Sequence, residues 1–221
     1  MPAYNEEESI KTVINNIKNI VDGILVVDDG SSDNTAKYAQ ECGVEVIRFP
    51  KNRGKGAAIR EGYKYFLSSD YDVCVIYDGD GQYRKEDILP VCKPIIDDEA
   101  DIVVGSRFLG KYKEGANINY RIRILCNHIS TFVTRIMSGL PTTDAQSGLV
   151  AINRYAAEVL DLEAERWGIH QEIIIRAGKK GLRYKEVPIV FEKRMHGVSR
   201  LEILKYPFMA FPVMLKAWLR K

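Results

Sequence analysis

Apolar residues follow two alternating patterns along this chain of 221 residues. Short runs rich in Val and Ile, at residues 24–28, 44–48, 73–77 and 102–105, predict strands that are buried on both faces. Between these runs apolar residues recur at helical spacing, and they predict helices over 10–17, 32–42, 56–67 and 85–97. The alternation predicts an α/β fold with a doubly wound, mainly parallel sheet, which binds ligands beyond the carboxyl ends of its strands.

The two ends of the chain depart from this rhythm. The sequence begins in the turn before the first helix, so we expect the leading strand to be absent or the start codon to be placed too late. Asn5 and Glu8 predict a capping box for that first helix. Residues 108–143 are interpreted as a long connector, followed by a strand at 148–152, a helix at 167–181 and a strand at 183–187.

We expect one domain over residues 1–200 and a basic, apolar, amphipathic segment over 201–221. The apolar run at 206–215 is too short to span a bilayer, and its two prolines argue against one regular helix. It could simply cover the core. Alternatively it lies in a membrane interface, with Lys205, Lys216, Arg220 and Lys221 at anionic headgroups.

Charge is distributed unevenly although the net charge is only +2. Residues 176–221 carry 12 Lys and Arg against 3 Asp and Glu, whereas the preceding part carries 20 against 27. A basic end on an acidic body indicates contact with phosphates or an anionic membrane surface. Nucleic acid is not expected as a partner, because the sequence contains no recognised nucleic-acid-binding module.

The four cysteines have no paired spacing, so neither a zinc site nor a disulfide framework is predicted. The three histidines, His128, His170 and His196, also lack ligand spacing, and we expect each to be exposed or satisfied in the core. With no signal peptide and no apolar run of about 18 residues, we expect a cytoplasmic protein, peripheral on the cytosolic face of a membrane.

Polar clusters follow five successive strands, and they carry the candidate chemistry. The most informative is Asp78-Gly79-Asp80-Gly81-Gln82, where two carboxylates one residue apart leave a buried strand. Such oxygen ligands suit Mg²⁺ or Mn²⁺, which commonly bridge carboxylates to substrate phosphates. An ordinary Gly/Asp turn is the alternative. The other clusters are residues 2–6 (PAYNE), 27–33 (VDDGSSD), 52–56 (NRGKG) and 105–107 (GSR), which together favour a nucleotide site.

In this order the five strings resemble family 2 of the inverting glycosyltransferases, which have the GT-A fold. Later motifs are similar to those of its polyprenyl-phosphate branch, which includes dolichol-phosphate mannosyl- and glucosyltransferases. These motifs are TDAQSG at 143–148, Glu172, EVP at 186–188 and FEKRMHGVSR at 191–200. Two positions depart from the family: Arg200 stands where lysine is usual, and Leu149-Val150 where Phe-Arg is common.

The resemblance implies roles for individual residues. The nucleoside of a sugar donor would be bound by Pro2, Tyr4, Glu6, Val27 and Asp29. Asp78, Gly79 and Asp80 would lie along the pyrophosphate, with Asp80, Gln82 and the nearby Asp78 holding Mg²⁺ or Mn²⁺. Arg194 and Arg200 would close over the phosphates, and Arg107 would contact the donor sugar or the acceptor phosphate. Arg121 and Arg123 lie either on a solvated face or, with Ser199, at the acceptor.

Three functions remain open at this point. The first is metal-dependent, inverting transfer of a hexose from GDP-mannose or UDP-glucose to a dolichyl or polyprenyl phosphate, which needs no strong base. Membrane contact would then be peripheral or would depend on an anchoring partner subunit. The second is transfer to a hydroxyl, for which Asp144, placed first because it should face the cleft, or Glu172 would be the base. The third is a nucleotide-sugar-binding module without catalysis.

Overall fold

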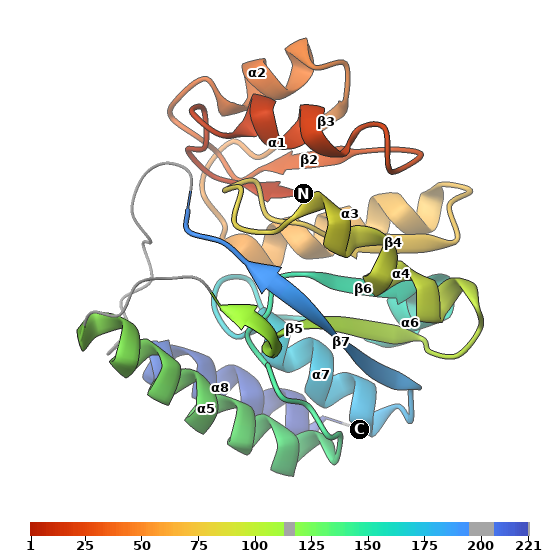
Figure 1. Ribbon diagram of the computed structural model, residues 1–221, viewed down its shortest axis with the longest axis vertical. Coiled ribbons are helices and arrows are strands. Elements are labelled where there is room, and N and C mark those ends of the chain that lie inside the picture. The colour runs from red at the N-terminus through yellow and green to blue at the C-terminus, as the bar shows by residue number, and fades with distance from the viewer. Residues whose placement is uncertain (113–117, 195–205, 221) are drawn as a thin grey trace.

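The predicted strands form two hydrogen-bonded sheets in the computed structural model, which describes residues 1–112, 118–194 and 206–220 (Figure 1). The first sheet is parallel, in the order β1 (Pro2–Ala3), β2 (Leu25–Asp28) and β3 (Glu45–Arg48). The second has the order β4 (Val73–Ile76), β6 (Val150–Asn153), β5 (Ile102–Tyr112) and β7 (Tyr184–Phe191). β5 and β7 are parallel, whereas β6 is antiparallel to both of its neighbours. The α/β class is therefore as predicted, with β6 as the exception to the parallel order.

Helices connect and cover these strands. Apolar faces of α1 (Ile10–Ile17) and α2 (Thr35–Glu41) pack on the first sheet, whose core includes Ile10, Ile14 and Val26. Two larger cores enclose the second sheet, and its central strand contributes alternate residues to each, Ile102 and Val104 to one and Val103 to the other. Around them lie α3 (Lys55–Ser68), α4 (Ile88–Ile96, after a 3₁₀ turn at Lys85–Asp87), α6 (Arg154–Val159) and α7 (Ile169–Lys179).

The start of the chain differs in one respect from what the sequence predicts. Pro2 and Ala3 pair with Val27 and Asp28 of β2 as a two-residue strand, and whether a longer leading strand precedes it stays a prediction. The expected capping box is absent, since α1 begins only at Ile10 and Asn5 instead accepts a hydrogen bond from the backbone N–H of Ser32 (2.9 Å). Asn5 therefore joins the first two strand-end loops, and the polar residues that suggested a cap stabilise the loop beside β1.

The predicted connector is largely a helix, α5 (Ile118–Ser138), which lies beside α8 (Tyr206–Leu219) at one end of the molecule (Figure 1). α8 is a single helix despite Pro212, which removes a backbone donor and costs about 3 kcal/mol in a helix interior. Burial of Ala210, Met214 and Ala217 against Ile175 of α7 compensates for that loss. Among the described residues, no helix is both long and apolar enough to cross a bilayer.

Candidate functional site

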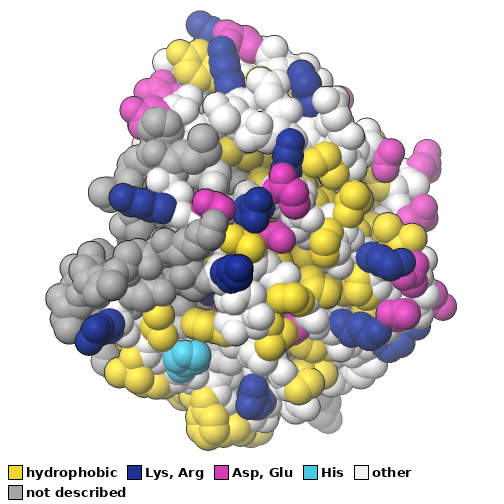
Figure 2. Space-filling view, in the orientation of Figure 1, with side chains coloured by type: hydrophobic (Ala, Val, Ile, Leu, Met, Phe, Trp, Pro, Cys, Tyr) yellow, Lys and Arg dark blue, Asp and Glu magenta, His cyan; other side chains and the backbone are white. Residues whose placement is uncertain are grey.

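The loops that follow the strands surround a cavity of about 450 Å³. Figure 2 shows Lys, Arg, Asp and Glu side chains gathered in this middle region of the molecule. The cavity brings together eleven of the residues proposed from the sequence: Pro2, Tyr4, Glu6, Asp29, Asp78, Gly79, Asp80, Gln82, Arg107, Arg123 and Arg194.

Four other candidates do not line the cavity, and one of them, Glu172, is described below. Val27 is 1% exposed and packs in the apolar core under β2, so its side chain is not placed to meet a nucleoside. Arg121 is exposed at the start of α5. Asp144 is fully buried beneath Arg107. Ser199 and Arg200, and with them part of the predicted phosphate-closing loop, lie outside the described residues.

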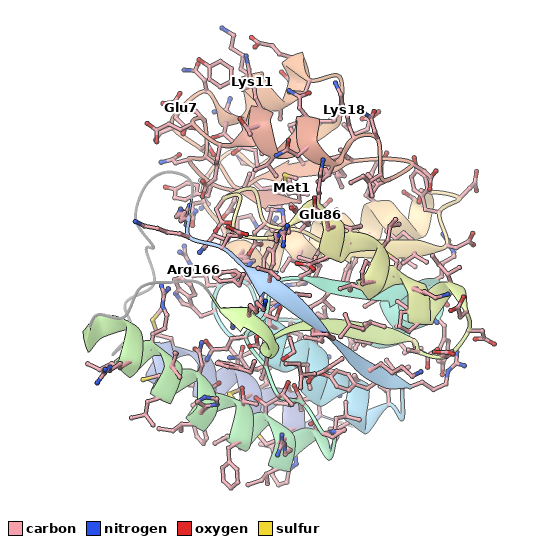
Figure 3. All side chains as sticks on the ribbon, in the orientation of Figure 1. Met1, Glu7, Lys11, Lys18, Glu86 and Arg166 are labelled. Atoms are coloured by element: carbon pink, nitrogen blue, oxygen red, sulfur yellow. The ribbon has the colours of Figure 1, made fainter. Side chains whose placement is uncertain are left out.

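One end of the cavity is organised around Asp29, which directly follows β2. Its two carboxylate oxygens accept hydrogen bonds from the backbone N–H groups of Arg53 (2.7 Å) and Gly54 (2.8 Å). Gly54 has φ = 107°, and a Cβ there would meet the Arg166 backbone at 2.8 Å, so glycine is needed before α3. Arg166, labelled in Figure 3 between the first sheet and α5, lines the cavity beside these residues. Asp29 therefore shapes the loop at 52–54 and keeps oxygen lone pairs for a ligand.

Asp78 is held by Lys55, the first residue of α3. The Lys55 Nζ lies 2.7 Å from Oδ1 and 2.8 Å from Oδ2 of Asp78. Gly148 gives this pair room, because a Cβ at Gly148 would approach Asp78 Oδ2 to 2.6 Å and the Tyr83 hydroxyl to 3.0 Å. The Gly148 N–H donates to that hydroxyl (2.5 Å), which joins the turn before β6 to the Asp78–Gln82 loop.

Asp80 lies in a more crowded position. Burial and the neighbouring Asp78 carboxylate raise the pKa of Asp80 to about 6, although Arg194 opposes the shift. Arg194 Nη1 is 3.4 Å from Asp80 Oδ2, and its Nη2 pairs with Glu6, so this arginine joins β7 to the first loop. The Asp80 carboxylate also accepts from the Gln82 N–H (3.1 Å), and the Gln82 side chain donates to the Glu192 carbonyl (3.1 Å).

These groups fit a divalent cation of the magnesium type. Two neighbouring carboxylates, Asp78 and Asp80, favour a cation that neutralises their charge beside the substrate phosphates. Within the described residues no three His, Cys, Asp or Glu side chains gather as a closed cage. Mg²⁺ commonly binds through one or two carboxylates and completes its coordination with water and substrate phosphates. Asp80, with Asp78 and Gln82 beside it, is such an open site.

Arg107 lies in β5 where its pairing with β7 shifts register, and it is held by Asp144. The ion pair is bidentate, with Nε 2.7 Å from Oδ2 and Nη2 2.7 Å from Oδ1. Asp144 Oδ2 also accepts from the Arg107 backbone N–H (3.0 Å), and the guanidinium lies 5.1 Å from the Phe191 ring centre. The expectation that Asp144 faces the cleft was wrong, because its oxygens are used to hold this arginine.

Glu172 is also occupied. It is 2% exposed on α7, and its oxygens accept from the N–H groups of Glu163 (3.0 Å) and Ala164 (2.8 Å). Burial raises the pKa of its carboxyl. Glu172 therefore holds the loop before α7 in place. Neither of the two candidate bases, Asp144 and Glu172, lines the cavity.

α5 connects the cavity with an exposed apolar surface. Arg123 and Asn127 of this helix line the cavity. On its outer side α5 exposes a row of large apolar residues at helical spacing, and we call this set the α5 row: Ile122, Leu125, Ile129, Phe132 and Ile136. Figure 2 shows apolar side chains along the lower edge of the molecule, where α5 lies in Figure 1.

Comparison with known proteins agrees with this geometry. Residues 1–160 match the model of the family described as glycosyl transferase family 2. The chain belongs to glycosyl transferase family 2. This glycosyltransferase is 38% identical over 209 residues to the UDP-N-acetylglucosamine–dolichyl-phosphate N-acetylglucosaminyltransferase of Methanococcus voltae, covering 86% of this chain and 82% of that protein. It is 30% identical over 212 residues to the undecaprenyl-phosphate mannosyltransferase of Micrococcus luteus, covering 91% and 85%.

Solved structures confirm the GT-A fold of the glycosyltransferase. Glucosyl-3-phosphoglycerate synthase from Mycobacterium tuberculosis, solved with Mn²⁺, UDP and phosphoglyceric acid, superimposes with a TM-score of 0.77. The two chains are 22% identical, and the match covers 100% of this chain and 77% of that one. At this identity the likeness concerns the fold alone.

Two features of the site were missed from the sequence. α5 was not predicted, although its apolar residues recur at helical spacing, because its Arg, Asn, His and Thr residues obscure the pattern. His170 was expected to be satisfied or exposed. It is instead 8% exposed in the cavity wall, and neither ring nitrogen has a hydrogen-bond partner among the described residues. Only the neighbouring Trp167-Gly168 turn, which opens α7 toward the cavity, could have indicated this position.

Proposed function

We propose that this glycosyltransferase moves one sugar, with inversion, from a nucleotide sugar to a polyprenyl or dolichyl phosphate at a membrane surface. The observation that carries the proposal is the position of α5. One side of the helix supplies Arg123 and Asn127 to the cavity, and the other exposes the α5 row. A lipid phosphate needs both a cationic pocket for its headgroup and an apolar surface for its chain, and a single helix supplies them here.

The donor would enter at the opposite end. Asp29 and the loop at 52–54 are placed for the nucleoside, and Asp78, Asp80 and Gln82 for the cation and pyrophosphate. Mg²⁺ or Mn²⁺ at Asp80 would neutralise the negative charge that develops on the leaving nucleoside diphosphate. Arg194, in the segment after β7, would contribute to the same stabilisation. Arg200 remains a candidate for the donor phosphates, and Ser199 remains a candidate for the acceptor.

An ionised acceptor agrees with the positions of the acidic residues. A hydroxyl acceptor would require a base, and the two candidates, Asp144 and Glu172, are both engaged away from the cavity. A phosphate monoester has a second pKa near 6, so it is largely ionised at neutral pH and needs no base. Arg107, held rigidly by Asp144, would orient the attacking phosphate or the sugar between donor and acceptor.

We propose that membrane contact is peripheral, on the cytosolic face where nucleotide sugars are available. The α5 row would dip into the interface, and α8 would add its own exposed residues: Met209, Phe211, Leu215, Trp218 and Leu219. Of the basic residues at this end of the chain, Lys216 pairs with Glu163 and Arg220 with Asp161, so the contact would depend mainly on the apolar residues. An anchoring partner subunit would strengthen the contact. The donors to test are GDP-mannose, UDP-glucose and, from the archaeal relative, UDP-N-acetylglucosamine.

A double substitution on the α5 row tests the acceptor side of the proposal. Leu125→Glu with Phe132→Glu should reduce binding to vesicles containing anionic lipid and polyprenyl phosphate at least tenfold, since two large apolar side chains are replaced by charges. Transfer to a short-chain, water-soluble prenyl phosphate should stay within twofold of wild type. Leu89→Glu with Ile96→Glu on α4, which are 58% and 66% exposed, is the matched control. Equal vesicle binding by both variants would contradict the proposal.

A further inference from the structure

The unexplained group in the cavity is the His170 imidazole. It follows Ile169, the first residue of α7, and the cavity is lined there by Gly168, Ile169 and His170. Burial lowers the pKa of His170 well below 6.5, and the nearby cations of Lys55 and Arg107 add to the shift. The ring is therefore neutral, with one N–H donor and one acceptor nitrogen.

A buried neutral imidazole without partners among the described residues calls for ligand groups that accept from one nitrogen and donate to the other, since unsatisfied buried polar atoms are costly. An ionised phosphate only accepts hydrogen bonds and could serve only the N–H. Each hydroxyl of a sugar can donate or accept, so it can bond to either nitrogen. The chemistry of the ring therefore favours a carbohydrate hydroxyl.

The position of His170 agrees with this chemistry. Lys55, one of its two cationic neighbours, holds Asp78 at the pyrophosphate end. The adjacent Gln171 donates to Ser130 of α5 (3.1 Å), on the acceptor side. His170 thus lies between the groups assigned to the pyrophosphate and those assigned to the acceptor, where the transferred sugar must lie.

We propose that His170 binds a hydroxyl of the transferred sugar and so helps to determine which nucleotide sugars are used. This inference rests on the proposed function, because it takes the cavity to hold a nucleotide sugar. It assigns His170 to the sugar and not to the nucleotide, the cation or the acceptor. Removing the imidazole should therefore affect the binding of nucleotide sugars and spare the binding of nucleoside diphosphates.

Isothermal titration with Mn²⁺ tests this separation. UDP, GDP and their sugar derivatives UDP-glucose, UDP-N-acetylglucosamine and GDP-mannose are titrated into wild type, His170→Phe and His170→Gln. For the preferred donor, His170→Phe should weaken nucleotide-sugar binding about tenfold, and the matching diphosphate should bind within twofold of wild type. His170→Gln, which keeps a donor and an acceptor, should recover part of the loss. His128→Phe, on an exposed histidine outside the cavity lining, is the matched control.

Each other outcome has a distinct meaning. Equal weakening of diphosphate and nucleotide sugar in both His170 variants would place the imidazole at the nucleotide and overturn the inference. Wild-type binding of both ligands with loss of turnover alone would assign His170 to the acceptor and also overturn it. A wild-type protein that binds none of the three nucleotide sugars would overturn the proposed function itself, and this inference with it.

Discussion

Replacing Asp80 by asparagine should stabilise the metal-free protein while abolishing transfer. The carboxyl has an ordinary pKa of 3.8, and burial with the nearby Asp78 charge raises it to about 6 in the folded protein. The folded state therefore holds this proton more tightly than the unfolded state, so the wild type loses stability as the pH rises from 3.8 to about 6 and gains none back above it. A change of this size corresponds to about 3 kcal/mol, since each tenfold difference in proton affinity is about 1.4 kcal/mol. Asparagine removes the charge with little change of shape.

Thermal unfolding at several pH values, with EDTA present, measures this effect. Asp80→Asn should match wild type near pH 4, gain stability as the pH rises to 6, and keep its advantage at pH 7. About 3 kcal/mol corresponds to roughly 6–12 °C for a chain of this length. Mn²⁺ with UDP should then raise the midpoint of wild type but not that of Asp80→Asn, because only the wild type retains the full cation site.

Asp78→Asn is the matched control, because the same chemical change there removes the ion pair with Lys55 (2.7 Å) and should bring no gain in stability. The reasoning would be refuted if Asp80→Asn were less stable than wild type at pH 7 without metal. It would also be refuted if Asp80→Asn kept wild-type transfer activity.

Two further substitutions test the supports of the site. Asp144→Ala should cost about 3–5 kcal/mol in urea unfolding, because the buried Arg107 loses its bidentate carboxylate partner. Adding Arg107→Met should recover stability but not transfer, and a loss below about 1 kcal/mol would argue against the pairing. Gly148→Ala should lower donor-dependent transfer at least tenfold, because its Cβ would approach Asp78 Oδ2 to 2.6 Å. Gly62→Ala, in open space on α3, should instead add about 0.5–1 kcal/mol of stability, and similar activity in both alanine variants would contradict this role for Gly148.

The strands and the cavity end of the sheet could be predicted because their signals are local. Runs such as 73–77 are rich in β-branched and aromatic residues, and each is followed by a polar cluster whose position at the strand end brings it to the site. The direction of β6 could not be predicted. The antiparallel pairing of Val150–Asn153 with β4 and β5 depends on how the chain returns from α5. The length of a connection does not specify that return path.

Side-chain partners were less predictable than positions. Asp144 and Glu172 are acidic residues in recognisable motifs, and both were expected to be available as bases. Asp144 instead binds Arg107, which is remote in sequence, and Glu172 binds backbone N–H groups of the loop that precedes its helix. The same limitation hid His170, whose ring has no hydrogen-bond partner in the described part of the chain, because this is visible only once the surrounding elements are packed. Pro212 in α8 shows the opposite error, because a local preference was overridden by burial of the helix against α7.

The measurement that tests the central claim most directly is transfer of labelled sugar into lipid. Wild-type protein is incubated with Mn²⁺, one labelled donor at a time (GDP-mannose, UDP-glucose or UDP-N-acetylglucosamine), and vesicles that contain either dolichyl phosphate or dolichol. We predict organic-extractable label from one of these donors with dolichyl phosphate, none with dolichol, and loss of the signal on chelation. Equal labelling of dolichol, or label that remains in the aqueous phase as a new conjugate, would contradict a lipid-phosphate acceptor.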